Sequence, residues 1–142
     1  MNFPVTVPFV EHLGMVLKAV DAEHCELGLN PLPEHLNSHG VTHGGVLMTL
    51  LDVAMATAAR AGRSDVGVVT IEMKTSFMQP ARGLLNVRGQ VKLRTTNMAF
   101  TEATVFDSHN RACAHATGTF KFVHTSARQS VSANAKSSII TD

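Results

Sequence analysis

The sequence predicts an α+β fold in which one long apolar helix is wrapped by a curved antiparallel sheet. Residues 44–61 are rich in Leu, Met and Ala, which favour helices. This segment is apolar around nearly its whole circumference, so it must be surrounded by protein rather than lie on a surface. Residues 66–124 are rich in β-branched and aromatic residues with partial alternation, which is typical of strands. A sheet curved around the helix would bury it.

The elements that precede the central helix are short. Apolar residues spaced along residues 7–13 predict one or two helical turns that end at Gly14. Residues 15–31 predict two strands joined by a turn at residues 21–23. A loop rich in turn-forming residues follows at 33–40 and leads to the central helix.

Four strands are predicted after the central helix, separated by short turns. We expect these turns to make consecutive strands antiparallel neighbours. The strands are expected at residues 66–80, 84–96, 98–108 and 112–124, with turns at residues 81–83, 96–97 and 109–110.

Size and composition predict a single domain. A chain of 142 residues with 44% hydrophobic content has room for one compact core, which we assign to residues 1–125. Residues 126–142 are rich in Ser and Ala and have few large apolar side chains. Such a segment cannot bury enough surface to offset the entropy of ordering, so we expect a flexible C-terminal tail.

The charge balance argues against nucleic-acid and membrane partners. The formal net charge is +1, from 12 basic and 11 acidic side chains, so no extended field would attract nucleic acid or an anionic bilayer. The longest apolar stretch, residues 46–59, is interrupted by Asp52 and is shorter than the ~20 residues that span a bilayer. The N-terminus lacks the pattern of an export signal. We therefore expect a cytoplasmic protein.

Cysteine and histidine usage predicts neither a metal nor another cofactor. Cys25 and Cys113 are isolated and lack CxxC spacing, so we expect them to be reduced core residues. His39 and His43 are four residues apart, but they flank Gly40 in a predicted loop rather than sharing one face of a helix. No other histidines form a tight metal-ligand pattern.

Asp52 is the only charged residue between Gly44 and Ala59. Its helical neighbours are apolar or weakly polar, so it has no polar face to join. The alternative is a carboxylate at a helix cap or on a solvated stripe, the usual positions of Asp, but Asp52 lies two turns inside the apolar helix. Burial there should raise the pKa of the carboxyl group and its basicity, as a general base or nucleophile requires.

The turn His43-Gly44-Gly45 leads straight into the helix and leaves amides that no side chain shields. Aided by the positive end of the helix dipole, such amides can hydrogen-bond an acyl oxygen and hold the oxyanion that develops during attack. The alternative is that the two glycines only permit a tight turn or close packing.

The distance between these two features predicts a dimer. Asp52 stands on the order of 10 Å along the helix axis from Gly45, so one helix cannot place its own amide and carboxylate on the same carbonyl. If the helices of two subunits pack antiparallel about a two-fold axis, each Asp52 can face the partner's glycine turn. We therefore expect an obligate homodimer with two composite sites.

The motif N-x-x-G-x-x-H-G-G-x-x-x-x-x-x-D, from Asn37 to Asp52, resembles that of the hotdog-fold thioesterases of the PaaI type. The later segment TIEMKTSFMQPA is similar to that family's strand after the central helix. With the order of elements, the resemblance spans roughly residues 13–123. It implies a hotdog fold, hydrolysis of acyl-coenzyme A, and dimers that often pair into homotetramers.

The resemblance also implies roles for individual residues. Asp52 would be the base or nucleophile, and the Gly44 amide would polarise the carbonyl. Asn37 resembles the family's loop asparagine that helps to position water or the thioester, and His43 would orient the turn or contact the thioester sulfur. Thr70 falls where relatives often have a Ser or Thr that can hold the attacking water.

Three further residues are candidates for substrate binding. The Gly45 amide would assist that of Gly44, and Met48 and Met55 would contact the acyl group. Methionine is adaptable, so medium-chain or aromatic acyl groups would fit, although filling the core is the alternative role for both methionines.

Other functions remain open from the sequence. A non-catalytic acyl-coenzyme A binding or sensing module could use the same turn, but a pure binding site would gain little from a desolvated carboxylate. A hotdog hydratase or dehydratase would pair a His with a carboxylate at a spacing that is not evident here. Arg111 and His115 could favour a Cys113 thiolate, but no oxyanion-binding feature accompanies them.

Overall fold

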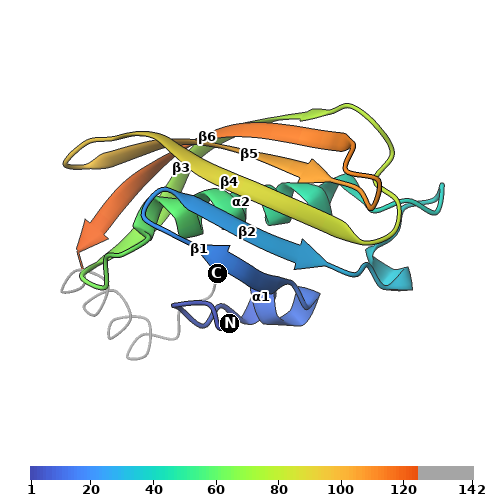
Figure 1. Ribbon diagram of the computed structural model, residues 1–142, viewed down its shortest axis with the longest axis horizontal. Helices are drawn as coiled ribbons and strands as arrows, with labels where there is room; N and C mark the ends of the chain where they lie inside the picture. The colour runs from blue at the N-terminus through green and yellow to red at the C-terminus, as the bar shows by residue number, and fades with distance from the viewer. Residues whose placement is uncertain (125–142) are drawn as a thin grey trace, which may run out of the picture.

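The computed structural model describes residues 1–124 (Figure 1). It confirms the predicted fold class, because six antiparallel strands form one sheet and one long helix packs against it. The predicted tail, residues 126–142, lies outside the described residues. In chain order the elements are α1 (Pro8–Leu13), β1 (Val16–Val20), β2 (His24–Leu29), the 3-10 turn η1 (Pro33–His35), α2 (Gly44–Arg60), β3 (Val66–Phe77), β4 (Leu85–Arg94), β5 (Met98–Phe106) and β6 (Ala112–His124).

The strand order is β1-β2-β4-β5-β6-β3, and every neighbouring pair is antiparallel. The short turns therefore join neighbours in the pairs β4–β5 and β5–β6, as predicted. The expectation that residues 81–83 make β3 a neighbour of β4 is wrong. β2 and β5 already occupy both edges of β4, so β3 pairs with β6 at the far side of the sheet. The connection crosses the start of β6, where the Met78 and Gln79 amides both donate to the Cys113 carbonyl.

One face of α2 is buried against the sheet, and the other is only partly covered. The sequence predicts a helix surrounded by protein, but within residues 1–124 the outer face, including Asp52, is half-buried, and Met48 is 38% exposed. No helix in this part of the chain has the length and apolar character needed to span a membrane. The buried residues of α2 are Leu47, Leu50, Leu51, Ala54, Met55, Thr57, Ala58 and Ala59.

The helix and the sheet approach each other closely at Gly89 in β4. A Cβ atom at this position would lie 2.7 Å from the backbone oxygen of Ala54 in α2, closer than Cβ atoms pack in proteins. Glycine is therefore required here for close approach rather than for an unusual backbone conformation. The small side chain of Ala54 completes this contact.

The C-terminal end of α2 is held by Arg94 at the end of β4. Its guanidinium group donates to the carbonyl oxygens of Ala58 and Ala59, at 3.2 and 3.1 Å, and to that of Ala22 at 3.1 Å. The last carbonyls of a helix have no partner within the helix and carry partial negative charge, so a cation there stabilises it. Arg94 thereby ties α2 to β4 and to the β1–β2 turn.

Replacing Gly89 tests the close approach. Because a new methyl group would meet the α2 backbone, we expect Gly89→Ala to lower the free energy of unfolding by about 1–3 kcal/mol. Urea denaturation would measure this change. Lys92→Ala, an exposed position on the same strand, serves as the control and should change stability by less than about 0.5 kcal/mol. Equal stability of both variants would contradict the close approach.

Candidate active site

Asp52 lies on the half-buried outer face of α2, on the side that faces β3. The Thr70 hydroxyl in β3 donates a 2.7 Å hydrogen bond to Asp52 Oδ1. Partial burial raises the pKa of the Asp52 carboxyl group above its ordinary value, and the hydrogen bond from Thr70 opposes this shift without cancelling it. The structure therefore brings two of the predicted site residues together and makes the carboxylate more basic than a solvated one.

A cavity of about 630 Å³ contains Asp52 and Thr70. This volume is typical of a small-molecule site. Among residues 1–124, Asp52 is the only acidic residue that lines this cavity, and Arg60 is the only basic one. The other lining residues are mostly apolar and come from the N-terminal segment, α2 and β3, so the carboxylate faces a largely apolar chamber.

The N-terminal end of α2 is capped by the side chain of His43. Its Nδ1 accepts a 2.8 Å hydrogen bond from the Gly45 amide. Because Nδ1 is the acceptor, the proton of the neutral ring lies on Nε2, which can donate to another group. The Gly45 amide is thus already paired within the chain, and the role predicted for it beside Gly44 stays a prediction.

The Gly44 amide remains as the candidate donor to a carbonyl. Gly44 is the first residue of α2, and within residues 1–124 no acceptor pairs with its N–H group. The ring of Phe77 in β3 lies 3.3 Å from the position that a Cβ atom of Gly44 would occupy. A free amide at the positive end of a helix dipole is suited to bind a developing oxyanion.

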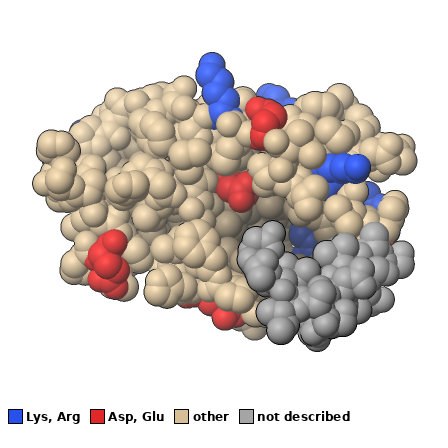
Figure 2. Space-filling model, turned by 180° about the vertical axis from the view of Figure 1, so that it is seen from behind, with Lys and Arg blue, Asp and Glu red and all other residues tan. Residues whose placement is uncertain are grey.

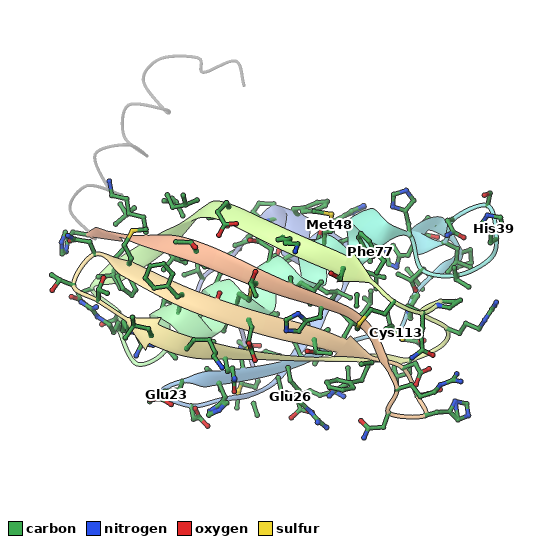
Figure 3. All side chains as sticks on the ribbon, turned by 90° about the horizontal axis from the view of Figure 1, so that it is seen from above. Glu23, Glu26, His39, Met48, Phe77 and Cys113 are labelled. Carbon is green, nitrogen blue, oxygen red and sulfur yellow. The ribbon has the colours of Figure 1, made fainter. Side chains whose placement is uncertain are left out.

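Asn37 organises the loop before α2. Its Oδ1 accepts hydrogen bonds from the amides of His39 and Val41, at 2.8 and 3.3 Å. Figure 3 shows His39 at the tip of this loop. The loop returns to η1, where the His43 amide donates to the His35 carbonyl at 2.8 Å. The Asn37 side-chain oxygen therefore positions the glycine turn through the backbone.

The two methionines predicted to bind substrate have different positions. Met48 lines the Asp52 cavity, whereas Met55 does not. Helical spacing places these residues on nearly the same face of α2, but the flexible Met55 side chain turns into the space above Gly118 in β6 and is completely buried. Met55 is therefore a core residue, and its predicted contact with substrate is wrong for this cavity.

Neither cysteine has the surroundings of a nucleophile. Cys113 is fully buried at the start of β6 (Figure 3), and burial raises the pKa of its thiol, with a further increase from the charge of Asp107. Burial also raises the pKa of Cys25, to about 12. No group of three or more His, Cys, Asp or Glu side chains that could share a metal ion is found within residues 1–124.

One wall of the cavity is formed by a segment that the sequence did not identify as part of a site. The N-terminal segment contributes Phe3, Pro4, Val5, Val7, Phe9 and Val10. Apolar residues occupy alternate positions from Phe3 to Phe9, so a signal was present. It indicates burial on one side but does not identify the surface that the segment covers.

The raised pKa of Asp52 makes a prediction about stability. The unfolded carboxyl group ionises near a pKa of about 3.9, and the folded one ionises at higher pH. Ionisation therefore reduces native stability as the pH rises between these two values, and the whole loss persists above them. Asp52→Asn removes this cost and can still accept the Thr70 hydrogen bond.

We accordingly expect Asp52→Asn to melt at a higher temperature than the parent at neutral pH, with the difference disappearing below the unfolded pKa. Melting temperatures across this pH range would measure the effect. Asp21→Asn is the matched control, because the hydrogen bond from the Glu23 amide lowers the pKa of Asp21. Replacing the Asp21 carboxylate should therefore not raise the melting temperature at neutral pH. A lower melting temperature of Asp52→Asn at neutral pH would contradict the assignment of a desolvated carboxylate.

Two curated relatives carry similar sequences. A Halobacterium salinarum protein, provisionally described as an esterase, is 31% identical over 105 residues, which are 68% of this chain and 70% of that protein. A Caenorhabditis elegans protein with the same provisional description is 35% identical over 71 residues, 49% of this chain. The match covers 42% of the nematode protein, so this chain spans less than half of that relative's length.

Solved structures share the fold. A provisionally described thioesterase of Ralstonia eutropha JMP134, related to phenylacetic acid degradation, has a TM-score of 0.76 and 29% identity, covering 82% of this chain and 92% of its own. The Escherichia coli PaaI protein, from the phenylacetic acid degradation operon, has a TM-score of 0.76 and 20% identity, covering 81% and 83%. The thioesterase superfamily profile matches residues 39–114. This chain belongs to the thioesterase superfamily and has the hotdog fold of its PaaI-type members.

Proposed function

We propose that this protein hydrolyses acyl-coenzyme A thioesters with medium-chain or aromatic acyl groups. One observation carries the proposal: the Asp52 carboxylate, with its raised pKa and its hydrogen bond from Thr70, faces a largely apolar cavity. Membership of the thioesterase superfamily supports hydrolysis of a thioester. A carboxylate of raised basicity is what proton abstraction from water or direct attack on a carbonyl requires.

Each active site is proposed to combine residues of two subunits. Gly44 and Asp52 are separated by about 12 Å of unbroken helix, so they cannot act on one carbonyl within one chain. The structure offers a surface for a second chain, because the 12-residue strand β3 is an edge of the sheet. Val69 and Ile71 on this strand are 46% and 53% exposed. A long apolar edge strand is a template for pairing with another copy.

The face that carries α2 is also suited to a homodimer. Figure 2 shows the side of the molecule that is hidden in Figure 1, and the charged side chains on it are few and scattered. Antiparallel association about a two-fold axis would bring the Gly44 amide of each chain toward the other chain's Asp52. Pairing of dimers into a homotetramer is the further assembly that the family resemblance implies.

The reaction follows from these positions. As a general base, Asp52 takes a proton from water while the water oxygen attacks the thioester carbon, and the carbon–sulfur bond then breaks to release coenzyme A. As a nucleophile, its carboxylate oxygen attacks that carbon, coenzyme A leaves as a thiolate, and water hydrolyses the resulting anhydride. In both routes the Gly44 amide from the other subunit stabilises the oxyanion. His43 Nε2–H is placed near the same helix end to donate to the departing sulfur.

Oxygen-18 labelling separates the two routes. Under single-turnover conditions in labelled water, oxygen-18 enters the Asp52 carboxylate only by the nucleophilic route, when water attacks the Asp52 carbonyl carbon of the anhydride. The general-base route places it only in the acid product. Oxygen-18 in the peptide that contains Asp52, measured by mass spectrometry, would establish the nucleophilic route.

Removing the Asp52 carboxylate should abolish most activity. We expect Asp52→Ala to lower kcat for acyl-coenzyme A hydrolysis by about 10² or more while the protein stays folded. Steady-state kinetics and circular dichroism would measure the two properties. Asp65→Ala, an exposed carboxylate outside the cavity, is the control and should retain parental kcat. Parental kcat in Asp52→Ala would rule out the proposed role.

The pH dependence of the reaction should report the same group. Catalysis needs ionised Asp52, so kcat/KM should fall as the pH decreases through its raised pKa, which lies above the ordinary 3.8. The residual activity of Asp52→Asn should lack this acidic limb. An unchanged limb in that variant would assign it to another group.

Mixed dimers test whether the site is shared between subunits. Gly44→Pro removes the amide hydrogen at the first helical position, where proline is well tolerated. The preceding His43 has φ −60° and ψ 140°, which suits a residue before proline. When Gly44→Pro and Asp52→Asn chains are refolded together, half of the dimers are mixed, and each has one intact composite site.

Random mixing should therefore restore about a quarter of parental activity, although each variant alone is nearly inactive. Rates measured before and after co-refolding would show this recovery. Parental protein treated in the same way controls for losses during refolding. If the mixture is no more active than the two variants alone, the proposal that each site combines two subunits is wrong.

A further inference from the structure

The N-terminal segment covers one side of the cavity that contains Asp52. We infer that residues 3–10 form the wall that selects the acyl group, and that the selected class is apolar acyl chains of medium length or aryl groups. This inference rests on the proposed function and extends it by assigning specificity to a segment outside the catalytic motif. The wall residues are Phe3, Pro4, Val5, Val7, Phe9 and Val10.

The contacts of Phe3 and Val10 anchor this wall. Phe3 is partly buried and packs against the hydrophobic core, and Val10 in α1 is 7% exposed. Gly14, at φ 79°, ends α1 and directs the chain into β1. Because the segment is attached to the core at both places, its apolar side chains form a defined boundary of the cavity.

The floor opposite this wall is the outer face of α2. Asp52, Ala56 and Arg60 are four residues apart, so they lie along one side of the helix, and all three line the cavity. The small Ala56 side chain leaves room between the carboxylate and the guanidinium group. This part of the floor extends over about 12 Å of helix axis.

Arg60 marks the end of the apolar part of the floor. Its Nη2 donates to the Val66 carbonyl at 3.2 Å, which holds the charged group where α2 approaches the start of β3. An apolar chain that extends from a thioester near Asp52 would pass Ala56 and then meet this guanidinium group. Methylene groups gain little from contact with a charged guanidinium group, so the cavity favours medium over long chains.

Chain-length dependence follows from the apolar lining. Each methylene that enters the cavity should increase kcat/KM by up to about fourfold. The increase should stop once the space between Asp52 and Arg60 is filled. Coenzyme A esters of straight-chain acids from butyryl to palmitoyl, together with phenylacetyl- and benzoyl-coenzyme A, provide the series that measures this profile.

Two substitutions change the shape of the cavity and leave Asp52, Gly44 and Thr70 unsubstituted. Ala56→Leu fills the floor, and we expect kcat/KM for decanoyl-coenzyme A to fall about tenfold or more while that for butyryl-coenzyme A changes less than about threefold. Phe3→Ala removes part of the wall and should also reduce the preference for decanoyl over butyryl. The matched control is Phe100→Ala, because Phe100 is 40% exposed in β5 and does not line the cavity. Equal losses for all chain lengths, or an unchanged profile, would overturn the inference.

A binding measurement separates the wall from the chemistry. The chain contains no tryptophan, so Phe3→Trp would give a single fluorophore in the wall. In the Asp52→Asn background, a non-hydrolysable thioether analogue of decanoyl-coenzyme A should change its emission, whereas coenzyme A alone should not. Unchanged emission, or the same change with both compounds, would contradict the inference that residues 3–10 contact the acyl group.

The two experiments also distinguish failure of the inference from failure of the proposed function. If the parental protein hydrolyses no thioester in the series but the tryptophan responds to the decanoyl analogue, the wall is supported and the hydrolytic function is wrong. The opposite result is hydrolysis without a change in tryptophan emission and with an unchanged chain-length profile in Phe3→Ala. That result would support the function and contradict the assignment of residues 3–10 as the selecting wall.

Discussion

The close packing of α2 on the sheet is the constraint on which the remaining structure depends. Gly89 and Ala54 let the two backbones approach more closely than larger side chains would permit, and the leucines of the inner helix face fill the space on either side. Arg94 holds the C-terminal end of the helix to β4. With one face and one end secured, the orientation of α2 about its axis is determined, and so is the direction in which every other side chain of the helix points.

That orientation turns Asp52 toward β3 and the cavity. The carboxylate is buried enough to raise its pKa, and the Thr70 hydroxyl holds one of its oxygens. This environment makes the ionised group costly to the folded state and more basic at the same time. A structural role alone would be served better by an uncharged side chain. The same desolvation that destabilises the fold therefore supplies the reactivity that the proposed hydrolysis needs.

The two ends of the motif from Asn37 to Asp52 have separate roles in the proposed mechanism. At the start of α2, the loop that Asn37 organises and the His43 cap leave the Gly44 amide as the donor without a partner in residues 1–124. Asp52 lies two turns further along the same rigid helix. Since a helix cannot bend these groups onto one carbonyl, a second subunit becomes a geometric requirement of the proposed mechanism. The exposed edge of β3 is the surface on which we expect that subunit to pair.

The sequence by itself determined features that depend on local interactions. Helix propensity predicted a helix over residues 44–61, and the observed helix is Gly44–Arg60. The isolated charge of Asp52 in that helix indicated a candidate site, because a carboxylate among apolar residues is rarely structural. The glycine turn before the helix followed from the two adjacent glycines, Gly44 and Gly45, at the start of the apolar run. These signals are readable because capping, propensity and periodicity act over a few residues.

Only the tertiary structure decided features that depend on distant parts of the chain. β3 pairs with β6 because β2 takes the position beside β4, which no property of the turn at 81–83 encodes. Met48 and Met55 share a helix face by spacing, yet Gly118 provides space for Met55 and leaves Met48 in the cavity. A helix that is apolar all round does not specify which side meets the sheet. That choice arises from the shapes of surfaces that come together only when the chain folds.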